Sequence, residues 1–125
     1  MLTLSDSATR ISDLRKRIHD FIRVRNWEKY HNPKDLAISI SIEASELLER
    51  FQWMNEKDVK SLSKSDKILG PARKELADII IYCLSFANVM GIDISEAVLE
   101  KIEENSAKYP VEKVKNRYRK YTDIV

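Results

Sequence analysis

Apolar residues recur at helical spacing in four parts of the chain. Residues 5–27 begin with potential capping residues and continue with an amphipathic pattern formed by Ile11, Leu14, Ile18, Phe21 and Ile22. Asn32-Pro33 marks the start of a second helix, predicted over about residues 33–53, since Pro suits the first helical turn. Residues 71–90 are predicted to form a third helix that is apolar on almost all sides, as in a helix buried between neighbours. Gly91 is expected to end this helix. A fourth helix is predicted from an Asp or Ser cap near residue 93 to a stop before Pro110.

The segments between and after these helices are mostly polar. Residues 54–70 predict a connection with one helical turn at 56–60, and residues 111–125 are expected to form an extended basic tail. The pattern therefore predicts an all-α, four-helix-type bundle in a single domain over residues 1–125.

Composition supports a helix-rich protein and narrows its environment. Hydrophobic residues make up 43% and charged residues 34%, with only two Gly, three Pro and a net charge of +2. The single Cys83 lies in an apolar run, which favours a buried structural thiol in a reducing compartment. No apolar run approaches the ~20 residues of a membrane span. We therefore expect a cytoplasmic protein without a membrane partner.

One carboxylate in the second predicted helix falls on its hydrophobic face. On a helical wheel Glu43 points into the stripe formed by Leu36, Ile40, Leu47 and Phe51. Glu46 lies three residues further on and is a neighbour on the same surface. A carboxylate directed toward a core needs a partner, because burying an unpaired charge is costly.

The apolar third helix repeats this spacing with Glu75 and Asp78. If the two helices pack antiparallel, four carboxylates converge, which requires protonation or a bound cation. An all-oxygen ligand set favours a hard divalent ion, Mg²⁺ or alternatively Mn²⁺. A single E-x-x-E pair usually marks a solvated face, but two pairs in apolar sectors favour a metal site.

A carboxylate-bridged di-iron bundle is disfavoured. That architecture takes Glu-x-x-His motifs from two helices, and neither His19 nor His31 has a Glu three residues before it.

Several motifs together resemble a known family. The chain contains E-x-x-E-L-x-E-x-F-Q-W at 43–53, E-L-x-D at 75–78, K-Y-P at 108–110 and K-Y-T at 120–122. From about residue 13 onward it resembles the all-α nucleoside-triphosphate pyrophosphohydrolases of the MazG type, with the strongest likeness to the dCTP pyrophosphatase branch. The resemblance implies a Mg²⁺-dependent hydrolase that cleaves a (deoxy)nucleoside triphosphate, dCTP or a modified pyrimidine analogue, to the monophosphate and pyrophosphate, for pool balance or house-cleaning.

The same resemblance implies roles for individual residues. Its metal ligands match Glu43, Glu46, Glu75 and Asp78. Glu49 matches a further acidic position of the motif. For the reaction itself we expect Glu46 or Glu49 to act as general base and Lys101 to offset the charge that develops on the leaving pyrophosphate. The family's base-pocket positions match Trp27, Trp53 and Tyr82, and its triphosphate-binding positions match Lys101 and Asn105. Lys108 shares the helix face of Lys101 and Asn105, which suits phosphate binding, and Tyr109 lies in the matching K-Y-P motif. His19 is one residue from the family's pocket histidine, whose place Ile18 takes. Ile42, Ser45 and Asn116 stand where the family often has Gly.

Two other functions stay open from the sequence. Phosphoribosyl-ATP pyrophosphohydrolases have related helices and the same leaving group. A nucleic-acid-binding module could use the basic tail, where Tyr109, Tyr118 and Tyr121 alternate with Lys and Arg, but that reading leaves the inward carboxylates unexplained. The spread of apolar residues around the helices also predicts a homodimer or a dimer of dimers.

Overall fold

The structure is a computed structural model that describes residues 4–62, 66–118 and 120–123. Its contacts divide the chain into two compact units, one ending at Ile92 and the other beginning at Asp93. Every regular element in the described residues is helical, which confirms the all-α prediction.

The described residues of the first unit form three long helices and two short ones. They are α1 (Ile11–Val24), the 3-10 turn η1 (Glu28–Tyr30), α2 (Pro33–Glu49), α3 (Glu56–Lys60) and α4 (Asp66–Met90). The start of α2 was predicted from Asn32-Pro33. The Asn32 side chain accepts a hydrogen bond from the backbone N–H of Asp35 at 2.9 Å, and Pro33 takes the first helical position, where a missing N–H costs nothing.

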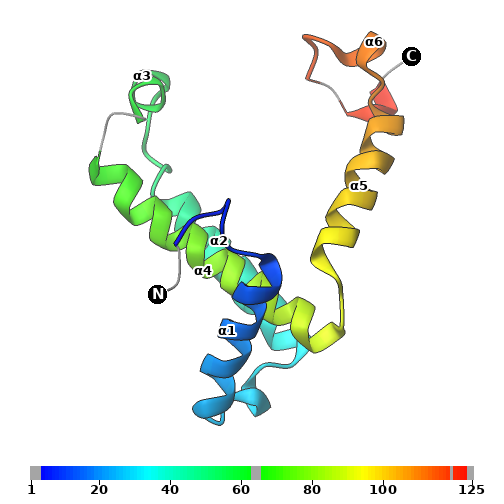
Figure 1. Cartoon of the computed structure of the whole chain (residues 1–125). Helices are drawn as coiled ribbons and strands as arrows, with labels where there is room; N and C mark the ends of the chain where they lie inside the picture. The colour runs from blue at the N-terminus through cyan, green and yellow to red at the C-terminus, as the bar shows by residue number, and fades with distance from the viewer. Residues whose placement is uncertain (1–3, 63–65, 119, 124–125) are drawn as a thin grey trace. The chain divides into compact units, whose positions relative to one another are not determined.

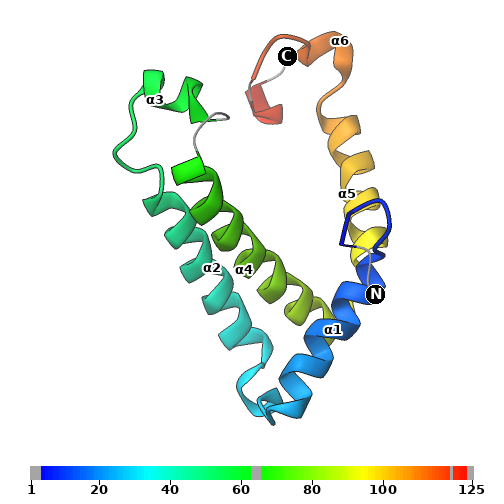
Figure 2. The same cartoon turned by 60° about the vertical axis from the view of Figure 1, so that its left-hand side comes forward.

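Helices α2 and α4 lie side by side and run antiparallel, and α1 packs against α4 (Figures 1 and 2). The core between them is small. Its buried hydrophobic residues are Ile22 of α1, Leu36 of α2, and Leu84 and Ala87 of α4. The antiparallel pairing is the arrangement that the two carboxylate motifs require.

Two helix boundaries differ from the prediction. Helix α2 ends at Glu49, four residues early, because the N–H groups of Arg50 and Phe51 turn to the carbonyl groups three residues back and tighten the chain. Helix α4 begins at Asp66, so the predicted start at Pro71 is wrong. Pro71 is the sixth residue of the helix, beyond its first turn, so it cannot donate the hydrogen bond that the Lys67 carbonyl would accept in a regular helix.

The second unit contains α5 (Ile94–Lys108), α6 (Val111–Val114) and the 3-10 turn η3 (Tyr121–Asp123). Asp93 begins α5, since its side chain accepts a hydrogen bond from the backbone N–H of Glu96 at 2.9 Å. The tail is not extended throughout: Pro110 has an extended backbone and starts the one-turn helix α6.

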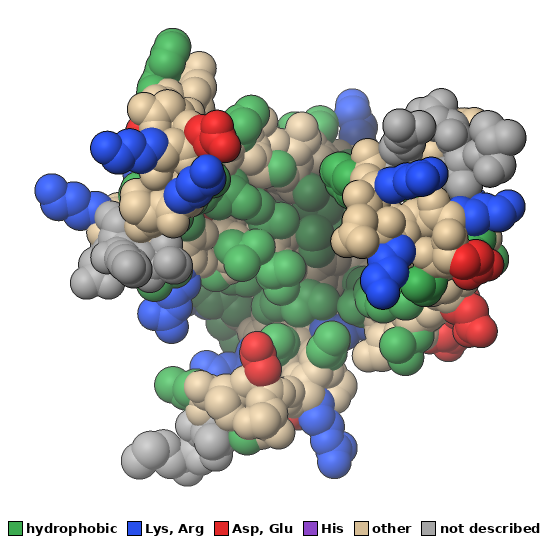
Figure 3. All heavy atoms as spheres, turned by 90° about the horizontal axis from the view of Figure 1, so that it is seen from above, with side chains coloured by type: hydrophobic (Ala, Val, Ile, Leu, Met, Phe, Trp, Pro, Cys, Tyr) green, Lys and Arg blue, Asp and Glu red, His purple; other side chains and the backbone are tan. Residues whose placement is uncertain are grey.

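Large hydrophobic side chains remain exposed on both units. Figure 3 shows many of them among the charged residues. The exposed residues on α4 are Leu69, Leu76, Ile80, Ile81, Val89 and Met90, and those on α5 are Val98, Leu99 and Ile102. Within the described ranges no single helix is long and apolar enough to cross a membrane, although α4 and α5 taken together meet that length and composition.

Candidate functional site

The α2–α4 pair brings carboxylates from both predicted motifs together. Glu43 of α2 and Glu75 and Asp78 of α4 each have a carboxylate oxygen within 4.8 Å of the others. Glu75 is largely withdrawn from water, with its side chain 12% exposed. Three anionic groups so close together repel one another unless a cation or a proton lies among them.

Glu46 lies next to this group and carries the signature of a shared proton. Hydrogen bonding to Glu43, and then to Glu75, raises the pKa of Glu46 from 4.5 to about 7. The two nearby negative charges add to the effect because they disfavour a further carboxylate. Glu46 thus lies close to Glu43 and Glu75, although it is not one of the three residues within 4.8 Å.

The oxygen atoms that this cluster offers as metal ligands suit a hard divalent cation. The Oε2 atom of Glu43 is buried and has no hydrogen-bond partner among the described residues. An unsatisfied carboxylate oxygen in such a position is costly, and it faces a group made only of oxygen ligands. Mg²⁺ and Mn²⁺ prefer this chemistry, whereas Zn²⁺ and Cu²⁺ prefer nitrogen and sulfur.

Arg50 is a member of this cluster that the sequence analysis did not identify. Its Nη2 atom donates a hydrogen bond to Glu75 Oε1 at 3.0 Å. The Arg50 guanidinium lowers the pKa of the Glu75 carboxyl. A signal was present, because Arg50 follows Glu46 by four residues and therefore shares its helix face.

The other candidate base, Glu49, is not brought into the cluster. It is the last residue of α2 and is exposed. Tyr82 lies one helical turn after Asp78 on α4 and is half-buried. Its place on the same helix as two of the carboxylates agrees with a position near a ligand held there.

The two predicted tryptophans lie in different settings. Trp27 follows α1 and packs edge-on against Phe21, with ring centroids 5.9 Å apart. Trp53 lies in the turn after α2 and is 87% exposed. An indole so exposed is not held by a core, so it is available to a ligand or to another chain.

A separate pocket of about 180 Å³ opens between α1, η1 and α4. Its lining residues are His19, Ile22, Glu28, His31, Ser85, Asn88 and Val89. His19, predicted to lie near the substrate, lines this pocket, whereas Trp27 and Tyr82 do not. Glu28, His31, Ser85 and Asn88 were missed, because only the fold brings η1 against the end of α4.

Hydrogen bonds fix the walls of this pocket. Arg15 Nε donates to Asn88 Oδ1 at 2.8 Å, Arg15 Nη1 donates to the Ile92 carbonyl at 2.6 Å, and Asn88 Nδ2 donates to the Arg15 carbonyl at 3.1 Å. His31 Nδ1 lies 2.8 Å from the Trp27 carbonyl, which can only accept. Nδ1 therefore carries the proton, and the neutral ring has Nε2 as an acceptor. Ser85 Oγ is buried with no partner among the described residues.

The predicted phosphate-binding residues lie in the second unit. Lys101 and Lys108 of α5 both pair with Glu104, each at 3.2 Å. Hydrogen bonds from Lys101 and Lys108 lower the pKa of Glu104. Asn105 lies between them in sequence, and its carbonyl accepts the N–H of Tyr109 at 2.8 Å. Their position relative to the carboxylates stays a prediction.

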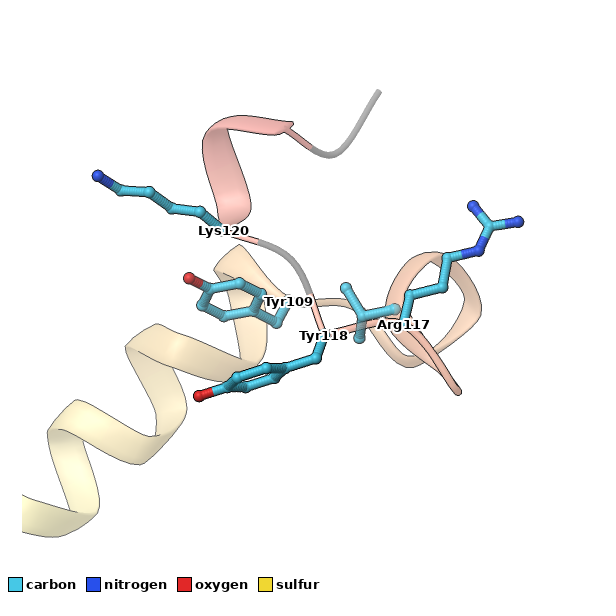
Figure 4. A pocket seen from close by; sticks show the side chains of 5 residues that line it. Tyr109, Arg117, Tyr118 and Lys120 are labelled. Carbon is cyan, nitrogen blue, oxygen red and sulfur yellow. The ribbon is translucent and has the colours of Figure 1, made fainter. Parts of the chain in front are cut away.

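Tyr109 lines a pocket within the second unit. This pocket has a volume of about 510 Å³ and is formed by Tyr109, Val114, Arg117, Tyr118 and Lys120. Figure 4 shows the two labelled tyrosine rings side by side, with Arg117 and Lys120 extending away from them. The Tyr109 ring also packs edge-on against Tyr121, with centroids 6.0 Å apart.

Comparison with known proteins identifies the family. The model of the MazG-like family matches residues 38–124, which include all four carboxylates and parts of both units. The chain belongs to the MazG-like family. Family membership and relatives of known activity confirm the prediction of a nucleoside-triphosphate pyrophosphohydrolase at the level of enzyme class.

Individual relatives agree with this assignment. The chain is 32% identical over 114 residues to bovine (Bos taurus) dCTP pyrophosphatase 1. The aligned region covers 91% of this chain and 68% of the bovine protein. Identity to the human (Homo sapiens) dCTP pyrophosphatase 1 is 31% over the same length, covering 91% and 67%. A pyrophosphatase of known crystal structure from Archaeoglobus fulgidus DSM 4304 is 38% identical, with a TM-score of 0.72 over 86% of this chain and 99% of that one.

Proposed function

We propose that this MazG-like enzyme hydrolyses a (deoxy)nucleoside triphosphate, dCTP or a modified pyrimidine analogue, to the monophosphate and pyrophosphate, and that it requires Mg²⁺. The observation that carries the proposal is the carboxylate group formed by Glu43, Glu75 and Asp78, in which a buried oxygen of Glu43 has no hydrogen-bond donor among the residues that the structure describes. Similarity to dCTP pyrophosphatases supports the choice of substrate.

Glu43, Glu46, Glu75 and Asp78 would hold the ion. When bound, Mg²⁺ neutralises phosphate oxygens and lowers the pKa of a bound water. Glu46 is the better candidate for the base that takes a proton from the attacking water, because it lies beside Glu43 and Glu75. Glu49 is the last residue of α2, and no contact among the described residues places it beside them.

The remaining predicted residues would hold the rest of the substrate. Lys101 would offset charge that develops on the leaving pyrophosphate, and Asn105 and Lys108 share its helix. This role requires Lys101 and Lys108 to exchange Glu104 for phosphate oxygens. Trp27, Trp53 and Tyr82 would pack around the base, with His19 and Tyr109 at its margins, since stacking on an aromatic ring is worth ~1–3 kcal/mol per base.

The protein is also proposed to act as a homodimer or a dimer of dimers. Among the described residues only four hydrophobic side chains are buried, Ile22, Leu36, Leu84 and Ala87. A chain of 125 residues normally buries well over half of its surface, and exposed apolar helix faces usually mark an interface. A second copy would cover the exposed apolar faces of α4 and α5. The single domain over residues 1–125 stays a prediction. Light scattering coupled to size exclusion tests this assembly, and a monomer at micromolar concentration would refute it.

The decisive experiment is a pyrophosphate-release screen over normal and modified nucleoside triphosphates and phosphoribosyl-ATP, with and without Mg²⁺. Glu43→Gln and Asp78→Asn should abolish turnover, because each removes one negative ligand. Glu56→Gln is the matched control, since Glu56 is an exposed acid of α3 that pairs only with Lys60 of the same helix at 3.4 Å. Near-normal turnover by Glu43→Gln, or activity without a divalent ion, would refute the site.

A further inference from the structure

Arg50 connects the two helices that carry the carboxylates. It lies just after the end of α2 and reaches Glu75 of α4, with 3.0 Å between Nη2 and Oε1. The other ion pairs among the described residues join positions three or four apart within one helix. The Arg50–Glu75 pair is therefore a tertiary contact of the acidic cluster.

The two partners differ in their freedom to move. Glu75 is only 12% exposed and is held in the middle part of α4, whereas the Arg50 side chain is 47% exposed. A long, half-exposed arginine can change rotamer at little cost, because solvent can replace its partner. The buried carboxylate is thus the fixed partner and the guanidinium the mobile one.

Glu75 is also one of the three carboxylates grouped within 4.8 Å. A guanidinium on Glu75 repels any other cation that approaches the same oxygens. It is in addition a planar donor whose geometry matches phosphate oxygens as well as it matches a carboxylate.

We propose that Arg50 is an internal counter-cation that competes with the divalent ion for Glu75 and, once displaced, binds the polyphosphate chain of the substrate. This inference rests on the proposed function, because it requires a metal and a polyphosphate at the same cluster. Arg50 would make binding of the free ion weaker and binding of the metal-loaded substrate tighter, so that the ion is retained chiefly when nucleotide is present.

The test measures binding rather than turnover. Mn²⁺ affinity of the full-length, chelator-treated protein is measured by electron paramagnetic resonance, first without nucleotide. The affinity for a nonhydrolysable α,β-imido deoxynucleotide is then measured by calorimetry at saturating Mg²⁺. Arg50→Met keeps the length of the side chain and removes its charge. Arg73→Met is the matched control, because Arg73 is an exposed arginine on α4 that lies two residues before Glu75 and so points to the other side of the helix.

Arg50→Met should bind Mn²⁺ about fivefold more tightly, which is the effect of removing a half-exposed ion pair. It should bind the nucleotide about tenfold more weakly, which is the effect of losing one charge-assisted hydrogen bond. Arg73→Met should leave both affinities within about twofold of the wild type, since screening weakens the effect of exposed charges.

Opposite shifts in the two affinities are the signature of the exchange. Unchanged or weaker Mn²⁺ binding by Arg50→Met would overturn the inference, and so would unchanged nucleotide binding. If Arg50 only fastened α2 to α4, the variant would melt at a lower temperature and both affinities would stay the same, which also overturns it. A wild-type protein that binds no Mn²⁺ would instead overturn the proposed function itself.

Discussion

The raised pKa of Glu46 makes metal binding depend on pH. Below pH 7 the carboxyl is mostly protonated, because hydrogen bonding to Glu43 and Glu75 raises its pKa to about 7. A metal ligand must be ionised, so an ion that uses Glu46 has to displace this proton. With a pKa of about 7, the protein should release about 0.9 proton per ion at pH 6, about 0.5 at pH 7 and about 0.1 at pH 8.

The same proton sets the apparent affinity. Affinity for Mg²⁺ should rise about eightfold between pH 5.5 and 6.5 and become almost constant above pH 8. Calorimetric titrations in two buffers of different ionisation enthalpy measure the released protons directly. Glu46→Gln should abolish the release of protons on Mg²⁺ binding, while the control Glu56→Gln should retain it.

The raised pKa of Glu46 also determines how the stability of the folded protein changes with pH. A carboxyl whose folded pKa lies above its unfolded value binds more protons when folded, so the metal-free protein should lose stability as the pH rises from about 4.5 to about 7. Added Mg²⁺ should restore that stability, as thermal melts would show. Metal binding without proton release at pH 6 would refute the reasoning.

Two further predictions concern the core and the exposed indole. Leu36→Ala should destabilise the protein by about 2–5 kcal/mol in urea unfolding, because this side chain is 1% exposed and its removal leaves a cavity between α2 and α4; a loss below about 1 kcal/mol would contradict this. Trp53→Ala should leave the melting temperature nearly unchanged, since the residue is 87% exposed. It should nevertheless raise KM at least about fivefold if the ring stacks on the base, and an unchanged KM would exclude that role.

Most of the helical architecture was predictable, because its signals are local. Asn32-Pro33 and Gly91, which has φ of 67°, mark helix ends through backbone geometry that few other residues provide. The end of α2 and the start of α4 were missed where such signals are absent. Nothing in residues 50–53 forbids a further helical turn. Pro favours the first helical position, so Pro71 gave a false signal for the start of α4, in which it is the sixth residue.

The carboxylates of the site could be predicted from the sequence, but the arginine that pairs with one of them could not. Glu43, Glu75 and Asp78 meet because each lies at a helical interval on the face where α2 and α4 pack. The pairing of Glu75 with Arg50 depends on where α2 ends, and helical periodicity does not determine that point. The pocket of His19 and His31 was missed for a similar reason, since the 3-10 turn η1 has only three residues and is too short to show a periodic pattern.

The reciprocal hydrogen bonds between Arg15 and Asn88 have a consequence for ligand selection. Arg15 forms hydrogen bonds with both the oxygen and the nitrogen of the Asn88 side-chain amide. That amide therefore cannot rotate to suit different ligands. The wall of the smaller pocket is therefore rigid before anything enters, and a rigid wall discriminates by shape with little loss of conformational entropy on binding. Changes in ligand preference can thus arise from Arg15, on a helix that contributes no carboxylate to the cluster.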